Sequence, residues 1–390
     1  MKVNLIIPTF YPATGFGGPI FSTLYAAKAL SSLDNIELIV STTNANANKA
    51  KKLDVKINTP IEFNQNFFVK YYNAVIGEVS FSLFTNIWKE IKSADVVHLQ
   101  AIFGTAIPVS LLYAKIFKKP LLLSPRGSLC EWCLNQGNGF KCVWLRLFIK
   151  PFANSITWHA TSDKEKEDIL EQFPKATVYK VPNGIDIEAF TKVNYYHKET
   201  YTQKYLQIKQ NPSKIIVSMG RLHKVKGFDI LIKSFQKICL KYPDAILLIA
   251  GKDAGEKAHL DKLIESHKLT ESIFFVGEVS DQDKIDFLAN ADLFILPSHT
   301  ENFGNVYVES LAAGTPIIAS TGTPWSEVES YHCGKWVENS VESTTKAALI
   351  LLEQDRKVLR KNALILAEKY NWKTIAKQFK AIFVRMENPQ

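Results

Sequence analysis

No stretch of this sequence is apolar over the roughly 20 residues that a membrane-spanning helix requires. The first residues, MKVNLIIP, also lack the long apolar core of a secretory signal and are typical of a first strand. The sequence therefore predicts a protein that stays in the cytoplasm.

Cysteine is scarce, with five in 390 residues. An odd number in a chain of this length argues against a framework of disulfides and favours a reducing compartment. Cys130, Cys133 and Cys142 are grouped closely enough to offer three ligands to a structural zinc, but no fourth ligand follows at the usual spacing. We interpret them as incidental thiols of a loop, with the metal site as the alternative.

Acidic residues are outnumbered by basic ones, 38 to 47, which gives a net charge of +9. Residues 1–186 carry +6 of this excess. There is no long basic run and no nucleic-acid motif, so no nucleic-acid partner is expected. The bias suits a nucleotide diphosphate, a lipid diphosphate or an anionic membrane surface.

The composition is that of a globular chain, with 46% hydrophobic residues, a mean hydropathy of −0.04 and no low-complexity tract. At about 150 residues per domain, the length allows two or three domains. Strand-like and helix-like segments alternate twice, which is the pattern of parallel sheets covered by helices. The strands expected in the first half are 3–7, 36–40, 95–99, 121–124, 156–160 and 177–181, with helices at 19–30, 106–116, 140–150 and 162–172. Those expected in the second half are 214–219, 245–250, 272–276, 292–296 and 317–320, with helices at 227–241, 256–267, 281–290 and 305–313.

The domain boundary is expected after residue 186, because a turn-rich segment at 181–186 precedes a polar tract that reaches Pro212. The sequence thus predicts a first domain at 1–186 and a second at 187–371. The terminal helix begins near residue 372.

The strongest functional signal lies between residues 292 and 316. A buried strand is predicted at 292–296, a loop at 297–304 and a helix at 305–313. Glu301 is therefore placed at the carboxyl end of a strand, where open α/β sheets bind their ligands.

The start of that helix suits a phosphate, because the backbone N–H groups of Phe303, Gly304 and Asn305 point out of its first turn. Glu309 lies past the middle of the same helix, where the macrodipole disfavours an anion. We therefore expect the Glu309 carboxylate to have a specific partner.

The run from Glu301 to Glu309, with Phe303 and Gly304 inside it and Ala-Ala-Gly-Thr-Pro after it, resembles the E-x7-E signature of the family-4 retaining glycosyltransferases. Enzymes of this family move a sugar from a nucleotide diphosphate onto an acceptor. The resemblance implies an α/β fold with GT-B architecture, in which two doubly wound Rossmann-like domains face a central cleft. It also implies that the terminal helix, about 372–390, crosses back onto the first, acceptor-side domain.

The resemblance assigns roles to single residues. Glu301 would lie beside the donor sugar, Glu309 would accept hydrogen bonds from the ribose, and the backbone from Asn302 to Asn305 would bind the donor. The segment TGTPW at 321–325 is similar to a subset of the family that builds bacterial surface polysaccharides such as O-antigen, capsule or exopolysaccharide.

The segment GRLHKVKG directly follows a predicted strand and resembles the diphosphate clamp of the family, with Arg221 and Lys226 as its two cations. An arginine fork and a lysine can neutralise a departing pyrophosphate without a metal. We therefore expect catalysis by Arg221, Lys226 and Glu301 with no metal ion and no cofactor.

A glycine turn near the first strand, GFGGP, is not a dinucleotide fingerprint, because Ile20 stands where the third glycine would be. It is similar to the glycine turn of the family, which implies that the backbone N–H groups of Gly17 and Gly18 approach the donor phosphates. An ordinary tight turn is the alternative.

The segment VVHLQ corresponds to a family segment that usually reads His-x-His, and here Gln100 replaces the histidine that faces the sugar. Glutamine can bind a hydroxyl but cannot titrate, which argues against acid–base chemistry at this position. His98 is expected to be a satisfied core histidine. Arg126, in a loop that resembles the acceptor-side loop of the family, is a candidate contact for the acceptor or a phosphate.

Aromatic, aliphatic and basic residues alternate in the segment 140–152. An interfacial membrane helix and a core-packing helix are both compatible with this pattern.

Together these features predict a retaining glycosyltransferase that is cytoplasmic and peripheral on the inner face of the cell membrane. Its partners would be a nucleotide-sugar donor and a glycan or lipid-diphosphate-linked acceptor. The alternatives are a nucleotide-sugar epimerase or hydrolase of the same fold and a non-catalytic nucleotide-sugar-binding subunit.

Overall fold

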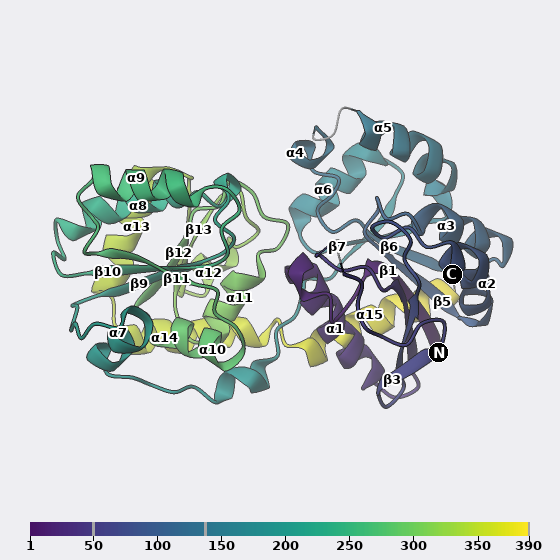
Figure 1. Ribbon diagram of the computed structural model, residues 1–390, viewed down its shortest axis with the longest axis horizontal. Helices are drawn as coiled ribbons and strands as arrows, with labels where there is room; N and C mark the ends of the chain where they lie inside the picture. Colours follow the sequence, from purple (N-terminus) through teal and green to yellow (C-terminus); the bar gives the residue numbers. More distant parts are fainter. Residues whose placement is uncertain (49–50, 136–138, 389–390) are drawn as a thin grey trace. The chain divides into compact units, whose positions relative to one another are not determined.

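The computed structural model describes residues 1–48, 51–135 and 139–388 of the chain. The chain forms two compact units (Figure 1): the first unit comprises Met1–Gly184 and Trp372–Gln390, and the second unit comprises Ile185–Asn371. The division falls two residues before the boundary expected after residue 186. Each unit has its own sheet and its own hydrophobic core.

The first unit is built on an eight-stranded sheet with the order β3-β4-β2-β1-β5-β6-β7-β8. Neighbouring strands are parallel, except that β3 runs antiparallel to β4 at one edge. The chain builds outward from β1 on one side and then returns to β5 on the other, so the switch point lies between β1 and β5. The strands are β1 (Lys2–Thr9), β2 (Glu37–Thr43), β3 (Pro60–Asn64), β4 (Phe67–Tyr72), β5 (Val96–Gln100), β6 (Leu121–Ser124), β7 (Thr157–Ala160) and β8 (Thr177–Lys180).

Helices cover both faces of this sheet, because alternate residues of a strand point to opposite faces. Val3 and Leu5 of β1 pack with α1 and α15, whereas Ile6 packs in a separate core with α2 and α3. The helices are α1 (Gly18–Ser31), α2 (Phe81–Ser93), α3 (Ile107–Ile116), α4 (Glu131–Leu134), α5 (Phe140–Trp144), α6 (Asp163–Gln172) and α15 (Trp372–Glu387).

The terminal helix α15 belongs to the first unit, where it packs against α1 and β5 (Figure 1). Its residues Ile375 and Phe383 are fully buried, and Trp372 lies against the backbone of Gly184. A Cβ at Gly184 would stand 2.4 Å from the Trp372 ring, so only glycine fits there.

The first unit differs from the sequence prediction in several elements. Strands β3 and β4 and helices α2 and α4 were not predicted. In β4 the burial alternates over the first four residues, but five of the six residues of FFVKYY are apolar or aromatic, so the sequence does not show the alternation of apolar and polar residues that marks a strand. The helix predicted at 140–150 is regular only as far as Trp144. It widens to a π-turn over Leu145–Ile149 and tightens to a 3-10 helix over Lys150–Ser155, in which Pro151 has no N–H to continue an α-helix.

The second unit is built on a six-stranded, wholly parallel sheet with the order β11-β10-β9-β12-β13-β14. Its switch point lies between β9 and β12. The strands are β9 (Ile215–Met219), β10 (Ile246–Ala250), β11 (Ile273–Gly277), β12 (Leu293–Leu296), β13 (Ile317–Ser320) and β14 (Gly334–Val337). Strands β10 and β12 are buried along their whole length, as both faces of a parallel sheet should be.

Figure 1 shows α8, α9 and α13 on one side of this sheet and α7, α10 and α14 on the other. The helices are α7 (Lys198–Leu206), α8 (Phe228–Cys239), α9 (Lys257–Ser266), α10 (Asp281–Ala289), α11 (Asn305–Ala312), α12 (Glu327–Ser330), α13 (Val341–Glu353) and α14 (Arg356–Glu368). Strand β14, helix α7 and the helices after residue 326 were not predicted from the sequence. Two Rossmann-like α/β domains are thus confirmed.

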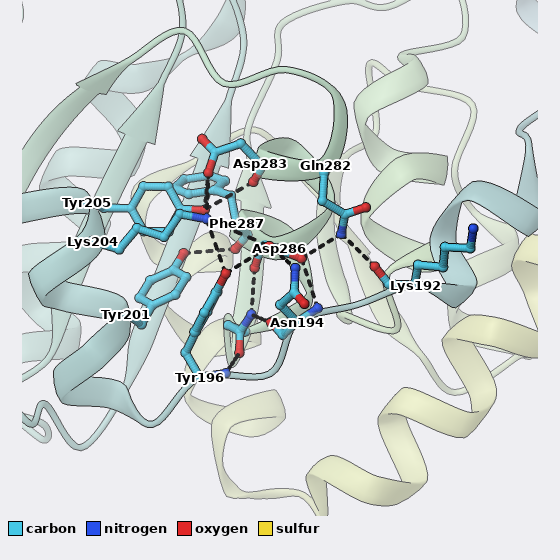
Figure 2. Close-up of polar contacts among 11 residues, drawn as sticks. Lys192, Asn194, Tyr196, Tyr201, Lys204, Tyr205, Gln282, Asp283, Asp286 and Phe287 are labelled. Atoms are coloured by element: carbon cyan, nitrogen blue, oxygen red, sulfur yellow. Dashed lines mark hydrogen bonds and ion pairs between the residues drawn. The ribbon is translucent and has the colours of Figure 1, made fainter.

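The polar tract before Pro212, expected as a linker, is fixed to α10 through the Asp286 carboxylate. This carboxylate accepts hydrogen bonds from the backbone (3.0 Å) and side-chain (2.9 Å) N–H groups of Asn194, from the Tyr196 hydroxyl (3.0 Å) and from the Gln282 amide (2.8 Å). Figure 2 shows these donors converging on Asp286 from the tract and from α10. Burial raises the pKa of Asp286, but the hydrogen bonds outweigh burial and hold it below its ordinary value.

Candidate functional site

The loops after β9 and β12 meet at the carboxyl edge of the second sheet. The backbone N–H of His299 donates to the carbonyl of Val225 (2.8 Å), which links the two loops directly. Gly227 has a φ of +67°, and a Cβ there would lie 2.0 Å from the carbonyl oxygen of Pro297. Only glycine allows this approach, so Gly227 sets the distance between the two loops.

Lys226 and Glu301, predicted on separate loops, form an ion pair. The Ser298 hydroxyl donates to the same Oε1 atom of Glu301 (2.9 Å). Both charged side chains are largely buried, with exposed fractions of 17% for Lys226 and 13% for Glu301. The structure therefore brings a clamp cation and the candidate sugar carboxylate together at the switch point.

The loop after β13 holds the Glu301 loop from its other side. The backbone N–H of Glu301 donates to the Gly322 carbonyl (3.2 Å), and the Ser320 hydroxyl donates to the Ser298 carbonyl. A Cβ on Gly322 would lie 2.1 Å from the His299 carbonyl oxygen, so this is a second place where glycine allows a close approach. Glu301 is thus positioned by backbone contacts on both sides.

The backbone between Glu301 and α11 is anchored by aromatic packing. Phe303 is buried against Trp325 and Tyr370, and the Trp325 indole N–H donates to the Phe303 carbonyl (2.6 Å). Gly304 caps α11 with a φ of +77° and has no side chain to accept from the first turn. Asn302 and Asn305 are half-buried on either side of these residues. Their predicted role in donor binding stays a prediction.

Glu309 has the specific partner that its place in α11 predicted. Its carboxylate pairs with Lys284 of α10 at 2.7 Å, and both side chains are partly exposed. The sequence indicated that a partner exists but not which residue it is, because Lys284 lies on a different helix. Its predicted contact with a ribose stays a prediction.

Arg221 follows β9 after a single residue, Gly220, and is exposed to solvent. Within the part of the chain that the structure describes, no ion pair includes its guanidinium. Arg221 and Lys226 thus differ: only Lys226 is bound to an acid of the site.

The metal-free expectation also assumed that the sequence has no Asp-x-Asp motif, and this assumption is wrong. Asp281 and Asp283 are two carboxylates one residue apart, a pattern that can hold a divalent cation. Asp283 pairs with Lys204 (2.7 Å) and accepts from the Tyr205 hydroxyl (3.2 Å), as Figure 2 shows. In the described residues no group of three His, Cys, Asp or Glu is arranged to hold a metal ion, and this includes Cys130, Cys133 and Cys142.

The glycine turn lies in the first unit, after β1. The backbone N–H of Gly17 donates to the Thr14 carbonyl (2.9 Å) and so closes the turn. Gly17 is also the N-cap of α1, and Gly18 is its first residue. Gly17 thus closes a turn at the start of α1. The predicted contact of Gly17 and Gly18 with the donor phosphates stays a prediction.

Gln100 and Arg126 are brought together at the carboxyl ends of β5 and β6. The Arg126 Nε donates to the Gln100 side-chain oxygen (2.6 Å), and its Nη1 donates to the Asn183 side-chain oxygen (2.9 Å). Gln100 is only 1% exposed: its side-chain oxygen holds the arginine, and its amide nitrogen contacts Nε2 of His98 (3.1 Å). Burial lowers the pKa of Arg126 to about 10, an effect that the nearby Glu165 carboxylate opposes.

The backbone of Arg126 is left-handed, with a φ of +58°, which is unusual for a residue with a side chain. Glu165 holds the following turn, because its carboxylate accepts from the Gly127 N–H (2.6 Å) and the Thr161 N–H (2.7 Å). Sequence analysis missed Glu165 and Asn183. Asn183 lies in a Pro-Asn-Gly turn directly after a predicted strand, and this position could have marked it as a candidate site residue.

His98 is a buried histidine in a chain of hydrogen bonds. Its Nε2 contacts the Ser124 hydroxyl (2.8 Å), the hydroxyl contacts Nδ1 of His159 (2.7 Å), and Nε2 of His159 contacts the Val181 carbonyl (2.7 Å). Burial lowers the pKa of His98 well below its usual range and that of His159 to about 3, so both rings are neutral at pH 7. The expectation of a satisfied core histidine holds only for one ring nitrogen, because Nδ1 of His98 has no partner in the described residues.

Comparison with protein families matches residues 202–378 to the model described as Glycosyl transferases group 1. The chain is 29% identical over 170 residues to the mannosylfructose-phosphate synthase of Agrobacterium fabrum, which covers 41% of this chain and 37% of the relative. It is 32% identical over 186 residues to a GDP-mannose-dependent monoacylated alpha-(1-6)-phosphatidylinositol monomannoside mannosyltransferase of Corynebacterium glutamicum, which covers 46% of this chain and 48% of that protein. The chain thus spans less than half the length of these curated relatives.

Among solved structures, the chain is similar to Anabaena HepE, whose crystal structure was determined in complex with UDP. The two share 18% sequence identity with a TM-score of 0.75, over 98% of this chain and 100% of HepE. At this identity the likeness shows the fold, and the fold is GT-B. The segment that matches the group 1 glycosyl transferase model, residues 202–378, includes Arg221, Lys226, Glu301 and Glu309.

Proposed function

We propose that this protein is a retaining glycosyltransferase of family 4 that transfers a sugar from a nucleotide diphosphate to a glycan or lipid-linked acceptor in surface polysaccharide synthesis. The observation that carries the proposal is the ion pair of Lys226 and Glu301 at the switch point of the second sheet. This is the crevice in which open α/β sheets bind ligands. The group 1 glycosyl transferase domain supports the reaction class.

The donor would be bound by the second unit. The first turn of α11 has no side-chain cap and offers backbone N–H groups and the positive end of its dipole to a phosphate. Arg221 would add a bidentate contact to the diphosphate. Glu309, already held by Lys284, would receive the ribose hydroxyls. HepE, which has the same fold, was crystallised with UDP, which fits a nucleoside diphosphate as the common element.

The pairing of Lys226 with Glu301 suggests how the two residues act. A diphosphate carries more negative charge than one carboxylate, so a bound donor should draw the ammonium group of Lys226 toward its leaving group. Glu301 would stay in place through Ser298 and Gly322 and would face the sugar. As the glycosidic bond breaks, Lys226 stabilises the departing diphosphate and Glu301 stabilises the positive charge on the sugar.

Retention follows if the acceptor hydroxyl attacks the anomeric carbon from the face that the diphosphate leaves. The departing phosphate oxygen can then take the proton of the acceptor, so no histidine is needed as a base. This agrees with the neutral, buried His98 and with Gln100, which cannot titrate. In the first unit Arg126 would contact the acceptor.

A membrane surface would present a lipid-linked acceptor. Four side chains on one segment are exposed. Three are apolar, Phe140 (63%), Val143 (54%) and Leu147 (58%), and the fourth is the basic Arg146. Leu145 is buried and ties the segment to the core of the first unit. Apolar groups beside a cation fit the interface of an anionic bilayer, so this aromatic-basic surface would hold the protein on the membrane. In the described residues no helix is long and apolar enough to cross a bilayer.

The test combines binding with turnover. A thermal-shift screen of the full chain against nucleoside diphosphates and their sugars should find one preferred donor, whose binding raises the unfolding midpoint by mass action. That donor should be consumed only when an acceptor is present. Consumption without an acceptor would support an epimerase or hydrolase, and binding without consumption would support a non-catalytic subunit.

The same assay tests the metal-free clamp. Because Arg221 and Lys226 are proposed to neutralise the leaving diphosphate, dialysis against a strong chelator should leave initial rates nearly unchanged. A complete loss of rate that magnesium or manganese restores would reject the clamp and would direct attention to Asp281 and Asp283.

A further inference from the structure

Cys130 and Cys133 occupy one turn at the start of α4. Cys130 is the N-cap residue, with an extended backbone (φ −63°, ψ 149°), and Cys133 lies three positions later inside the helix. Side chains at this spacing lie on the same side of the first turn. The Cys133 thiol donates a hydrogen bond to the Cys130 sulfur, so the two sulfur atoms are neighbours.

The surroundings make the two thiols unlike each other. The hydrogen bond from Cys133 lowers the pKa of Cys130 to about 6, against the opposing effects of burial and of the Asp168 carboxylate, with a smaller favourable effect of Lys164. The same hydrogen bond and burial raise the pKa of Cys133, which the Lys141 ammonium group opposes. Cys130 is therefore a thiolate at neutral pH and Cys133 a thiol.

The other three cysteines have no such partner arrangement. Burial raises the pKa of Cys239 to about 11 and that of Cys333 to about 12, so both are protonated at neutral pH. Cys142 is exposed and stands alone on α5. Cys130 and Cys133 are both half-buried, which leaves them accessible to a small reagent.

We propose that Cys130 and Cys133 form a thiol–disulfide exchange site that reacts with small-molecule disulfides such as oxidised glutathione and closes to an intramolecular disulfide. Cα atoms three residues apart in a helical turn lie at a separation that a disulfide can span. The loop that carries Arg126 and Gly127 ends at this pair of cysteines. The site therefore lies next to the segment proposed to contact the acceptor. The exchange itself does not depend on that assignment.

The steps balance with the disulfide as the only oxidant. The Cys130 thiolate attacks one sulfur of oxidised glutathione, forms a mixed disulfide and releases one glutathione thiolate, which takes up a proton. Cys133 then loses its proton and attacks the sulfur of Cys130, which releases the second glutathione thiolate. Two protein thiols are oxidised to one disulfide, and one glutathione disulfide is reduced to two thiols.

Mass spectrometry of the reduced full chain tests the proposal. After exposure to oxidised glutathione, denaturation and alkylation, the protein should have lost two hydrogens and should carry alkyl groups only on Cys142, Cys239 and Cys333. Peptide mapping should place the disulfide between Cys130 and Cys133. Cys142→Ser is the matched control and should oxidise like the parent.

Two single variants separate the roles of the two cysteines. Cys133→Ser should accumulate one glutathionyl group on Cys130, because the attacking thiolate remains and the resolving thiol is gone. Cys130→Ser should form neither the adduct nor the disulfide. Three results would each overturn the proposal. The first is that the Cys130→Ser variant gains a glutathionyl group on Cys133 as fast as the parent reacts. The others are that all five cysteines of the oxidised parent are alkylated, or that the disulfide forms with Cys142.

The pH dependence of alkylation gives a second readout. The rate at Cys130 should rise with a midpoint near pH 6, below the value of about 8.5 that is ordinary for a cysteine thiol. Cys133→Ala removes the hydrogen bond and should move the Cys130 midpoint upward, while Cys133→Ser keeps a donor and should move it less. A Cys130 midpoint equal to that of Cys142 in the parent would contradict the assignment.

Discussion

At the scale of single residues, Lys226 is the cation whose removal should affect the chemical step. Charge on the diphosphate grows as the bond breaks, so Lys226→Ala should lower the maximal rate on the order of a hundredfold at saturating donor. Lys224→Ala is the matched control, because Lys224 lies in the same turn but is exposed, and its rate should stay near the parental one. If Lys226→Ala raised only the Michaelis constant, the proposed role would be wrong.

The two glutamates should separate in the same assay. Glu309→Gln should weaken donor binding with a modest effect on the maximal rate, because a ribose contact is made equally in the ground and transition states. Glu301→Gln should lower the maximal rate and leave the affinity for the nucleoside diphosphate nearly unchanged. Saturation kinetics and diphosphate titrations measure both quantities. A parental maximal rate in Glu301→Gln would remove this residue from the chemistry.

At the scale of elements, the contact between the β9 and β12 loops depends on Gly227. Alanine there meets the Pro297 carbonyl and also adopts an unfavourable φ of +67°. Gly277→Ala is the control, because its φ of +76° imposes the same backbone cost, roughly 1–2 kcal/mol, while nothing lies within 4 Å of the new Cβ. Gly227→Ala should lower the unfolding midpoint more than Gly277→Ala and should abolish turnover. Equal unfolding midpoints for the two variants would mean that the β9 and β12 loops move apart without a loss of stability.

The attachment of the 194–205 tract to α10 should depend on pH. The pKa of Asp286 is lower in the folded state than in the unfolded state, so its ionised form stabilises the fold above its unfolded pKa near 4, and this contribution is lost as the pH falls through the folded value. The parent should therefore exceed Asp286→Asn in unfolding midpoint at pH 7, and the gap should shrink below pH 4. Asp281→Asn is the control, because Asp281 is exposed. A gap independent of pH would show that the carboxylate charge is not what holds the tract.

At the scale of the whole molecule, binding to anionic vesicles should combine apolar and charge contacts. The parent should float with vesicles at low salt and less at high salt, because screening weakens the attraction of the basic side chains. Phe140→Ser with Leu147→Ser should reduce flotation severalfold. Leu240→Ser is the control, because this side chain is 85% exposed on the second unit, and it should float like the parent. A parent that stays at the bottom at both salt concentrations would point to a soluble acceptor.

The sequence by itself determined the features that depend on a few consecutive residues. A buried strand, a loop with Glu301 and a helix that ends at glycine are local patterns, and they placed Glu301 and Lys226 each at a strand end. The same local reading indicated that Glu309 needs a partner. It missed β4 because five of the six residues of FFVKYY are apolar or aromatic, so the sequence shows no polar alternation. It missed α7 because this polar helix is held by contacts with a distant segment: its Lys204 pairs with Asp283 and Asp286 of α10.

The tertiary structure alone decided which of these residues meet. Lys226 and Glu301 are 75 positions apart, and they pair because β12 lies beside β9 and Gly227 lets the loops touch. Contacts between distant segments likewise pair Glu309 with Lys284, and they place the Gln100 side-chain oxygen where it accepts a hydrogen bond from Arg126. Strand order and side-chain contacts between distant segments follow from how the whole hydrophobic surface is buried, and no local pattern carries that information.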